Sequence, residues 1–341
     1  MKNKKMTKGE TLLMAIGVCG ELPADLVGRV VGSASYAAAL VTKLKEEKKI
    51  SCRSGDGIKG YVLRKKGTET LLMRFLEQMQ PFGDKDTGQN RIKSDPDKRL
   101  RLHRMAYAWV GMYGFGAAVF PRQFPAEKET YCPSVLVKRK IAREAMGSRA
   151  CGILDAGDHG FCVYHTMESL LKWNQRTEWT FRLRAAQSLY GAGEESRLQA
   201  IILAEDMRML ERILRSDGGI KKELFYPDDV YESYFYLPTF GNAKLQYRFL
   251  VDAVSEQKLK KRIAGLIPPG EEPAIFCWRL DLWQLRRTAD RILRNGKRTV
   301  ICLDYQAKAL QDYLGSEALV LGLKPEKISS ILNQEGGDPD E

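Results

Sequence analysis

The chain has 341 residues, of which 44% are hydrophobic and 29% charged, enough for two or three domains with packed cores. Its net charge of +12 favours a polyanionic partner. No apolar run approaches the roughly 20 residues of a membrane helix, and no apolar segment typical of a signal peptide follows the N-terminus. Together with seven scattered cysteines that form no CxxC pair, this predicts a cytoplasmic protein without a membrane partner.

Two short helices are expected first, over Glu10–Cys19 and Pro23–Val31. Pro23 suits the first position of a helix, because its missing N–H has no partner there in any case. Gly20 and Gly32 are typical of helix ends.

The following segment, Ser33–Ile50, predicts an amphipathic helix with Ser33 or Ser35 as its N-cap. Its apolar residues recur at helical spacing and form one stripe: Ala37, Leu40, Val41 and Leu44. The opposite face carries small or polar side chains: Ser35, Tyr36, Ala38, Ala39, Thr42 and Lys43. A helix that enters the major groove of DNA needs such a slim face with hydrogen-bonding groups.

After this helix the hydrophobic period changes to two. Strands are expected over Ile50–Arg53 and Tyr61–Arg64, joined by a Gly-rich turn, Ser54–Gly60, with Lys59 at its tip. A further helix is expected over Thr68–Met79.

Three helices, a hairpin and a fourth helix resemble the winged-helix family of helix-turn-helix domains. The resemblance implies that Ser33–Lys49 is a recognition helix, that Ser51–Lys66 is a wing, and that the ligand is double-stranded DNA. Residues 1–80 hold fifteen Lys or Arg against eight Asp or Glu, and this positive excess attracts phosphates. A small helical domain that contacts proteins is the alternative.

The expected DNA contacts form two sets. The side chains expected to face base edges are Ser35, Tyr36, Thr42 and Lys43. The side chains expected to neutralise phosphates are Lys45, Lys59, Arg64 and Lys65.

Residues 81–98 are polar and contain Pro, Gly and mixed charges, which predicts a linker between a domain of residues 1–80 and a second domain of residues 99–332. The second domain begins with a strong helix, on which Arg99, Arg101 and Arg104 are expected to remain available to solvent or phosphate. His103 is interpreted as a structural residue, with a catalytic role as the alternative.

The second domain then alternates between strands and helices. Early strands are expected over Ser134–Lys138, Ala150–Asp155 and Phe161–Thr166, before a long helix over Met167–Tyr190. Four strand and helix pairs follow, namely 198–203 with 206–215, 233–237 with 244–264, 274–279 with 281–294, and 299–303 with 305–314. Such alternation predicts an α/β domain, so the expected fold of the whole chain is α+β, ending in a disordered acidic tail over 333–341.

A winged helix, a linker, a helix that bears His103 and an α/β domain resemble, in this order, the replication-relaxation family of plasmid and conjugative-element proteins. The second domain of that family is similar to a degenerate restriction-endonuclease fold. By this resemblance, Leu154, Asp155 and Ala156 correspond to the family's strand with Pro-Asp-Ala, and the Pro is lost. His103 corresponds to a His at a helix start in the family.

Nucleases of that fold bind a divalent metal through an acid on one strand and an acid-x-Lys on the next. Asp155 suits the first position, but residues 161–166 contain neither an acid nor a lysine. We therefore expect no catalytic site, no metal and no cofactor. A metal-dependent DNA-nicking nuclease that uses Asp155 with Glu168 or Glu178 is the alternative.

Four residues of the types that bind zinc also lie within fifteen positions: Cys151, His159, Cys162 and His165. Their spacing matches no common zinc motif, and alternate positions there fit a buried strand, so we do not expect a metal.

The function expected from these features is double-stranded DNA binding by a protein of a mobile genetic element. It would act in plasmid replication or conjugation, or in their regulation, without catalysis of its own. The expected partners are duplex DNA and a replication or conjugation protein, with a homodimer left open. A third interpretation is an adaptor or inhibitor of a nucleoprotein complex.

Overall fold

The computed structural model describes residues 6–83, 94–141, 145–168, 174–215, 233–237, 244–264 and 273–333. About 56% helix and 20% strand make the fold mixed α+β. The chain forms two compact units: unit 1 comprises residues 1–167 and 174–203, and unit 2 comprises residues 168–173 and 204–341. The division near residue 203 falls inside the segment 99–332 that we expected to be one domain.

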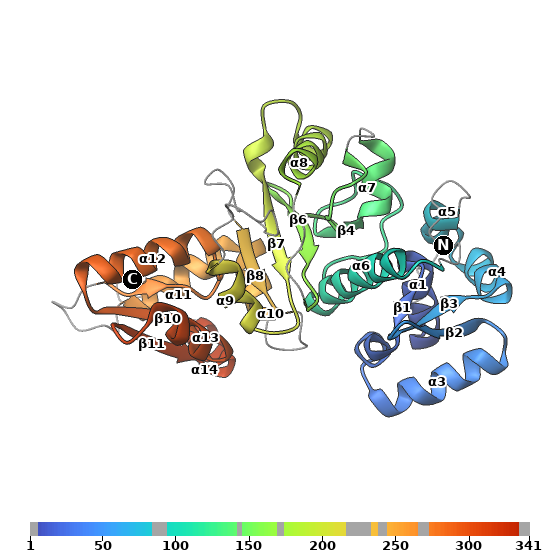
Figure 1. Cartoon of the computed structure of the whole chain (residues 1–341), viewed down its shortest axis with the longest axis horizontal. Helices are drawn as coiled ribbons and strands as arrows, with labels where there is room; N and C mark the ends of the chain where they lie inside the picture. The colour runs from blue at the N-terminus through green and yellow to red at the C-terminus, as the bar shows by residue number, and fades with distance from the viewer. Residues whose placement is uncertain are drawn as a thin grey trace. The chain divides into compact units, whose positions relative to one another are not determined.

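The first part of unit 1 consists of helices around a small antiparallel sheet (Figure 1). Its helices are α1 (Lys8–Cys19), α2 (Val27–Val31), α3 (Ala34–Glu46), α4 (Lys65–Arg74) and α5 (Leu76–Gly83). Its strands, in the sheet order β1-β3-β2, are β1 (Leu22–Pro23), β3 (Ile58–Leu63) and β2 (Ile50–Gly55).

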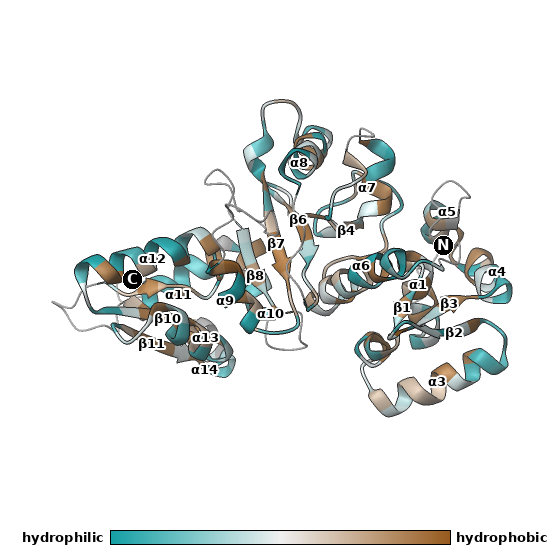
Figure 2. Ribbon diagram, viewed as in Figure 1, coloured by the Kyte–Doolittle hydropathy of each residue, from teal (hydrophilic) through white to brown (hydrophobic). Residues whose placement is uncertain are grey.

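Helix α3 begins where the sequence provides an N-cap. Gly32 ends α2 in the left-handed conformation, at φ 80°, and the Ser33 hydroxyl then accepts a hydrogen bond from the N–H of Tyr36 at 3.4 Å. The buried residues of α3 are the four of the expected stripe: Ala37, Leu40, Val41 and Leu44. The expected amphipathic helix is therefore confirmed, and its C-terminal half is hydrophilic in Figure 2.

The β2–β3 hairpin turns earlier than the sequence pattern predicted. Asp56 and Gly57 have φ values of 53° and 72°, the left-handed region that a tight two-residue hairpin turn requires. Because these two residues close the turn, the strands extend on both sides, and Lys59 lies on β3 opposite Ser54. The expectation that Lys59 forms the tip is wrong, since the tip carries Asp56.

Two predicted helices in this part were also wrong in their bounds. Leu22 and Pro23 pair with β3 as an edge strand, so the helix expected over Pro23–Val31 begins only at Val27. An edge strand tolerates Pro, whose missing N–H would break a central ladder. The helix expected over Thr68–Met79 starts three residues earlier and is divided at Phe75, where the backbone leaves the helical region at φ −138°.

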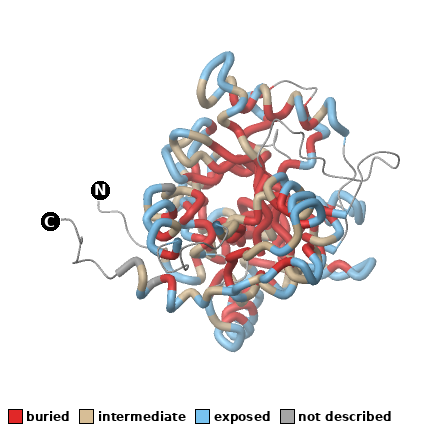
Figure 3. Tube along the Cα trace, turned by 90° about the vertical axis from the view of Figure 1, so that its left-hand side faces the viewer, coloured by how far each residue is buried: buried red, intermediate tan, exposed pale blue. Residues whose placement is uncertain are grey.

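The second part of unit 1 is a sheet with flanking helices. Its helices are α6 (Pro96–Phe115), α7 (Ser134–Lys140) and α8 (Gln175–Tyr190). Its strands follow the order β4 (Thr130–Pro133), β5 (Gly152–Asp155), β6 (Gly160–His165) and β7 (Leu198–Leu203). The first three strands are antiparallel, and β7 runs parallel to β6 after the crossover through α8. Strands β4 and β6 are buried along their whole length. Figure 3 shows buried residues in red in the interior and exposed residues in pale blue on the outer turns.

Three expectations for this part need correction. The segment Ser134–Lys138 is not a strand but the start of α7, whose Leu136 and Val137 are buried, so tertiary packing outweighs the β preference of its valines. The long helix does not start at Met167, which has φ 50°, but at Gln175 after the N-cap Asn174. In the expected linker, residues 81–83 belong to α5 and residues 96–98 to α6, while residues 84–93 lie outside the described ranges.

Unit 2 contains a parallel sheet in the order β11-β10-β9. The strands of this sheet are β9 (Ile275–Phe276), β10 (Arg298–Leu303) and β11 (Ala318–Leu323), and unit 2 also contains β8 (Ser233–Tyr236), which is not part of it. Its helices are α9 (Arg208–Leu214), α10 (Lys244–Val251), α11 (Ala253–Ala264), α12 (Leu282–Asn295), α13 (Asp304–Leu314) and α14 (Pro325–Asn333). The expected alternation of strand and helix is confirmed, but β11 and α14 were not predicted, and residues 334–341 lie outside the described chain.

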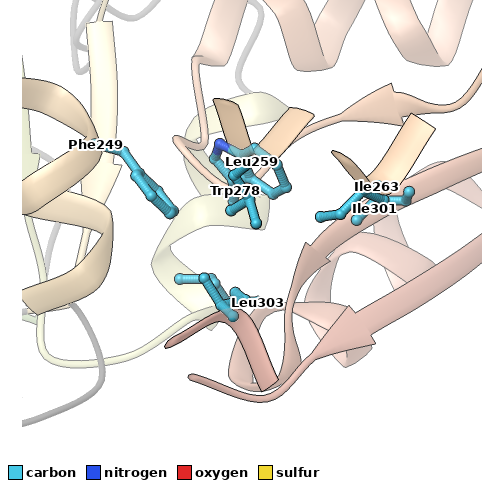
Figure 4. Close-up of a cluster of buried hydrophobic side chains, with 7 residues drawn as sticks. Phe249, Leu259, Ile263, Trp278, Ile301 and Leu303 are labelled. Carbon is cyan, nitrogen blue, oxygen red and sulfur yellow. The ribbon is translucent and has the colours of Figure 1, made fainter. Parts of the chain in front are cut away.

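The core of unit 2 forms where α10, α11 and the sheet meet. Trp278 is fully buried there, and its ring lies 5.5 Å from that of Phe249 (Figure 4). The indole N–H donates to Glu256 Oε1 at 2.8 Å, which satisfies the one polar atom of the ring. Around it pack Leu259, Ile263, Ile301, Leu303 and Ile328.

Candidate nucleic-acid interface

The outer face of α3 is exposed along its length. All eight side chains expected to contact DNA are exposed: Ser35, Tyr36, Thr42, Lys43, Lys45, Lys59, Arg64 and Lys65. Between them, Ala38 and Ala39 are also exposed and keep the middle of the helix narrow. The first four belong to α3 itself, so one helix face presents hydroxyl, phenol and ammonium groups to solvent.

One contact within α3 and one with α1 orient these groups. The Thr42 hydroxyl donates to the carbonyl of Ala38 at 3.1 Å, which leaves its oxygen lone pairs facing outward as acceptors. The ring of Tyr36, 46% exposed, lies 5.3 Å from the Lys8 ammonium. Lys8 is a cation that the sequence pattern did not single out, because its proximity to Tyr36 exists only in the folded chain.

The hairpin and the start of α4 extend the positive surface. The Lys45 ammonium lies 5.3 Å from the ring of Tyr61 on β3, so the end of α3 packs over the hairpin. Lys59 projects from β3, while Arg64 and Lys65 form the junction between β3 and α4. Lys65 has a loose contact of 4.0 Å with Glu69, which is exposed and therefore weak.

Three acidic residues of this part are paired with cations. Glu10 is buried and pairs with Arg74, and Glu21 is buried and pairs with Arg99. The Glu47 carboxylate bonds to Lys49 at 2.8 Å, and this bond lowers its pKa. The other acidic residues are exposed and offset part of the positive charge: Asp25, Glu46, Asp56, Glu69 and Glu77.

Glu21 links the hairpin to α6. Arg99 donates hydrogen bonds to the Glu21 carboxylate from Nη2 at 2.6 Å and from Nε at 3.1 Å. His103 Nε2 lies 3.0 Å from the same carboxylate. Burial alone raises the pKa of Glu21, but the hydrogen bonds from Arg99 and His103 outweigh burial, so this pKa lies below its usual value. Burial lowers the pKa of His103, although the hydrogen bond to Glu21 acts in the opposite direction.

The contacts of Glu21 bear on two expectations about α6, one for Arg99 and one for His103. Arg99 is not available to phosphate as we expected, because it is buried at 3% exposure and also donates to the carbonyls of Gly55 and Ile58. His103 is buried and bonded to Glu21, which agrees with the structural interpretation of this residue. The ends of the hairpin turn are thus fixed to α6, and the cluster was invisible in the sequence because Glu21 and Arg99 are 78 residues apart.

The nuclease residues of the alternative interpretation are not brought together in unit 1. Asp155 ends β5, where it accepts the N–H of Gly157 at 2.9 Å and pairs with Gly160. The hydroxyl of Tyr190, at the end of α8, lies against Gly160. Glu178 is twelve residues before Tyr190 on α8, a distance of about 18 Å along the helix. The two carboxylates therefore cannot share one metal ion.

Glu178 is instead a buried acceptor in the core. It receives hydrogen bonds from the Ser148 hydroxyl at 2.7 Å, from the Arg149 N–H at 2.6 Å and from the Tyr164 hydroxyl at 3.1 Å. Burial outweighs these bonds and raises the pKa of Glu178. Glu168, the other alternative, is exposed and belongs to unit 2.

The four residues of zinc-binding type also have separate environments in the structure. Cys151 and Cys162 are buried free thiols, and His165 Nδ1 accepts the N–H of Met167 at 3.0 Å. The His159 ring packs edge-on against Phe161. Within the described ranges, no three His, Cys, Asp or Glu side chains gather closely enough to hold a metal ion.

Comparison of the chain with protein-family models, with curated proteins and with solved structures found no match. Among the helices in the described part of the chain, none alone is long and apolar enough to cross a membrane. The segments Ala24–Val31 and Ala34–Glu46 reach that composition only together, across a bend of 111°.

Proposed function

We propose that the chain binds double-stranded DNA through a winged helix-turn-helix at its N-terminal end. In this proposal α3 is the recognition helix, the β2–β3 hairpin is the wing, and α4 begins with phosphate-binding cations. The order of three helices, a strand between the first two, and a hairpin supports the winged-helix assignment. The α6 helix would hold the wing in position through Arg99, so the DNA-binding surface would already have its bound arrangement in the free protein.

One observation carries the proposal. On α3 the apolar stripe is buried, while the whole opposite face is exposed, narrow and polar, and cations continue from it onto β3 and α4. A face of this kind admits base-edge contacts in the major groove, and the flanking cations supply the salt-dependent part of the affinity.

The proposed protein has no catalysis of its own, and its second sheet would be a nuclease-type scaffold without a nuclease site. A helix, three antiparallel strands, a crossover helix and a parallel strand support a restriction-endonuclease-like arrangement. Asp155 lies at the Tyr190 end of α8 and Glu178 twelve residues earlier on that helix, and this separation argues against metal-dependent nicking. A role in plasmid replication or conjugation, with a protein partner, is the context in which we place this binding activity.

The test is the salt dependence of binding to a labelled duplex, followed by fluorescence anisotropy. Lys59→Ala combined with Arg64→Ala removes two exposed cations that would contact phosphates. Each lost contact reduces the magnitude of the negative slope of log K against log salt by about 0.9, so the slope is expected to become less steep by about 1.8.

The matched control is Lys308→Ala with Lys327→Ala, which removes two exposed cations from α13 and α14. This control is expected to leave the slope unchanged. An unchanged slope in the first variant, an equal loss in the control, or no duplex binding at low salt would each contradict the proposal.

A further inference from the structure

A hollow of about 600 Å³ lies in unit 2 beside the edge strand of the parallel sheet. Its size is typical of ligand sites, which range over about 300–1,000 Å³. Helix α12 forms one wall, and β9 with the start of β10 and one residue of α11 forms the rest. The lining residues are Lys260, Pro273, Ala274, Ile275, Phe276, Gln284, Arg291, Asn295 and Arg298.

A second hollow of about 300 Å³ continues the first along α12. The two share Ile275, Gln284 and Arg291, so they form one elongated track rather than two separate pockets. The second hollow adds Trp283 and Arg287 from the first turns of the helix. In Figure 2 the ribbon of α12 is predominantly hydrophilic.

The track is strongly positive. Its cations are Lys260, Arg287, Arg291 and Arg298, and its acidic lining residue is Asp281. Asp281 caps α12 by accepting the N–H of Gln284 at 3.0 Å, and Lys260 is paired with Glu256 at 3.0 Å. Arg291 is exposed and has no ion pair within the described residues. The charge left for a ligand therefore comes mainly from Arg287 and Arg291, which are both exposed.

Flat aromatic surfaces accompany these cations. Trp283 is 40% exposed, and the guanidinium of Arg287 lies 4.3 Å from the centre of its ring. Phe276 lines the larger hollow, and its ring rests 4.8 Å from that of buried Trp278, which fixes it in place. The Gln284 amide is held by a bond from its NH₂ to the Phe276 carbonyl at 3.2 Å, so its oxygen remains an acceptor.

We propose that this track in unit 2 binds a single strand of nucleic acid, with phosphates on Arg287, Arg291 and Arg298 and unpaired bases on Trp283 and Phe276. A cationic groove with aromatic platforms is the recurring solution for single strands, because every base has a face that can stack. A duplex does not offer free base faces, and an elongated track suits a polymer better than a free nucleotide. This site is independent of the duplex-binding proposal for unit 1.

The test uses the full chain and a labelled oligothymidylate of about 16 nucleotides. Arg287→Ala with Arg291→Ala changes two exposed helical positions to the best helix former, so the fold is expected to persist. Affinity is expected to fall at least tenfold. The negative slope of log K against log salt is expected to become less steep by about 1.4, at about 0.7 for each lost contact to a single strand. Trp283→Ala is expected to lower affinity at least about fivefold through lost stacking, and Trp283→Phe to restore most of it.

Lys308→Ala with Lys327→Ala is again the matched control, expected to bind the oligonucleotide like the unchanged protein. Lys59→Ala with Arg64→Ala is expected to affect duplex but not oligothymidylate binding, which separates the two proposals. If the Arg287 and Arg291 changes leave oligothymidylate binding unaltered, the inference is overturned. Equal affinity for a free thymidine nucleotide also overturns it, as does tighter binding of polyglutamate that depends on the same two arginines.

Discussion

At the scale of single residues, Glu21 determines how the hairpin is held. It is 1% exposed and receives two guanidinium nitrogens of Arg99 together with the ring N–H of His103. Arg53, on β2 of the hairpin, forms a longer ion pair with Glu21 at 3.7 Å. Such a buried network is not strong evidence of net stabilisation, but removal of the carboxylate leaves the guanidinium of Arg99 charged and unpaired.

We therefore predict that Glu21→Gln lowers the free energy of unfolding by about 3–5 kcal/mol, because it leaves the Arg99 charge buried without a counterion. Urea unfolding followed by circular dichroism measures this change. The control is Glu69→Gln, which breaks only the exposed contact with Lys65 and is expected to change stability by less than about 1 kcal/mol. Equal effects of the two substitutions would contradict the role assigned to Glu21.

At the scale of elements, prediction from sequence succeeded where local pattern and burial agree. Helix α3 has an N-cap and a stripe at helical spacing, so its start and its buried face followed from the sequence, although it ends at Glu46 and Ile50 belongs to β2. The exposure of Lys43 and Thr42 followed from the same stripe. Strand β1 and helix α7 were missed because each depends on a distant partner: Leu22 is a strand residue only by pairing with Tyr61.

The same limit applies to the candidate site. The cations on α3, β3 and α4 could be identified from the winged-helix pattern, whereas the bonds of Arg99 to Glu21 and the hairpin depend on contacts between residues far apart in sequence. The track that contains Trp283 and Arg291 was also missed, because residues of α12 form a hollow only together with β9. Pairs of contacting residues from separate elements leave no period in the sequence.

Adjacent positions on α3 give a prediction with two opposite readouts. Leu44→Ala is expected to lower the free energy of unfolding by about 2–5 kcal/mol, because this side chain is buried in the stripe. Lys43→Ala is expected to change stability by less than about 0.5 kcal/mol but to weaken duplex binding, because this side chain is exposed. Urea unfolding and anisotropy measure the two quantities, and destabilisation by Lys43→Ala would contradict the assigned faces.

At the scale of the whole molecule, the seven free cysteines are distributed over both units, so their reactivity measures how well each unit is packed. Six are buried, namely Cys19, Cys132, Cys151, Cys162, Cys277 and Cys302. Burial raises the pKa of each of these six thiols, which further reduces their reactivity because the thiolate is the nucleophile. Cys52 alone is half-buried, and it lies on β2 of the hairpin proposed to act as a wing.

We predict that one thiol reacts rapidly with a chromogenic disulfide reagent in the folded protein and that all seven react in concentrated urea. Cys52→Ser is expected to remove the rapid phase, whereas Cys302→Ser leaves it intact. Saturating duplex is expected to slow the reaction of Cys52, because DNA bound on the hairpin restricts access of the reagent. Several rapid thiols would show that the cores are open, and an unchanged Cys52 rate with DNA would mean that the duplex does not cover the hairpin.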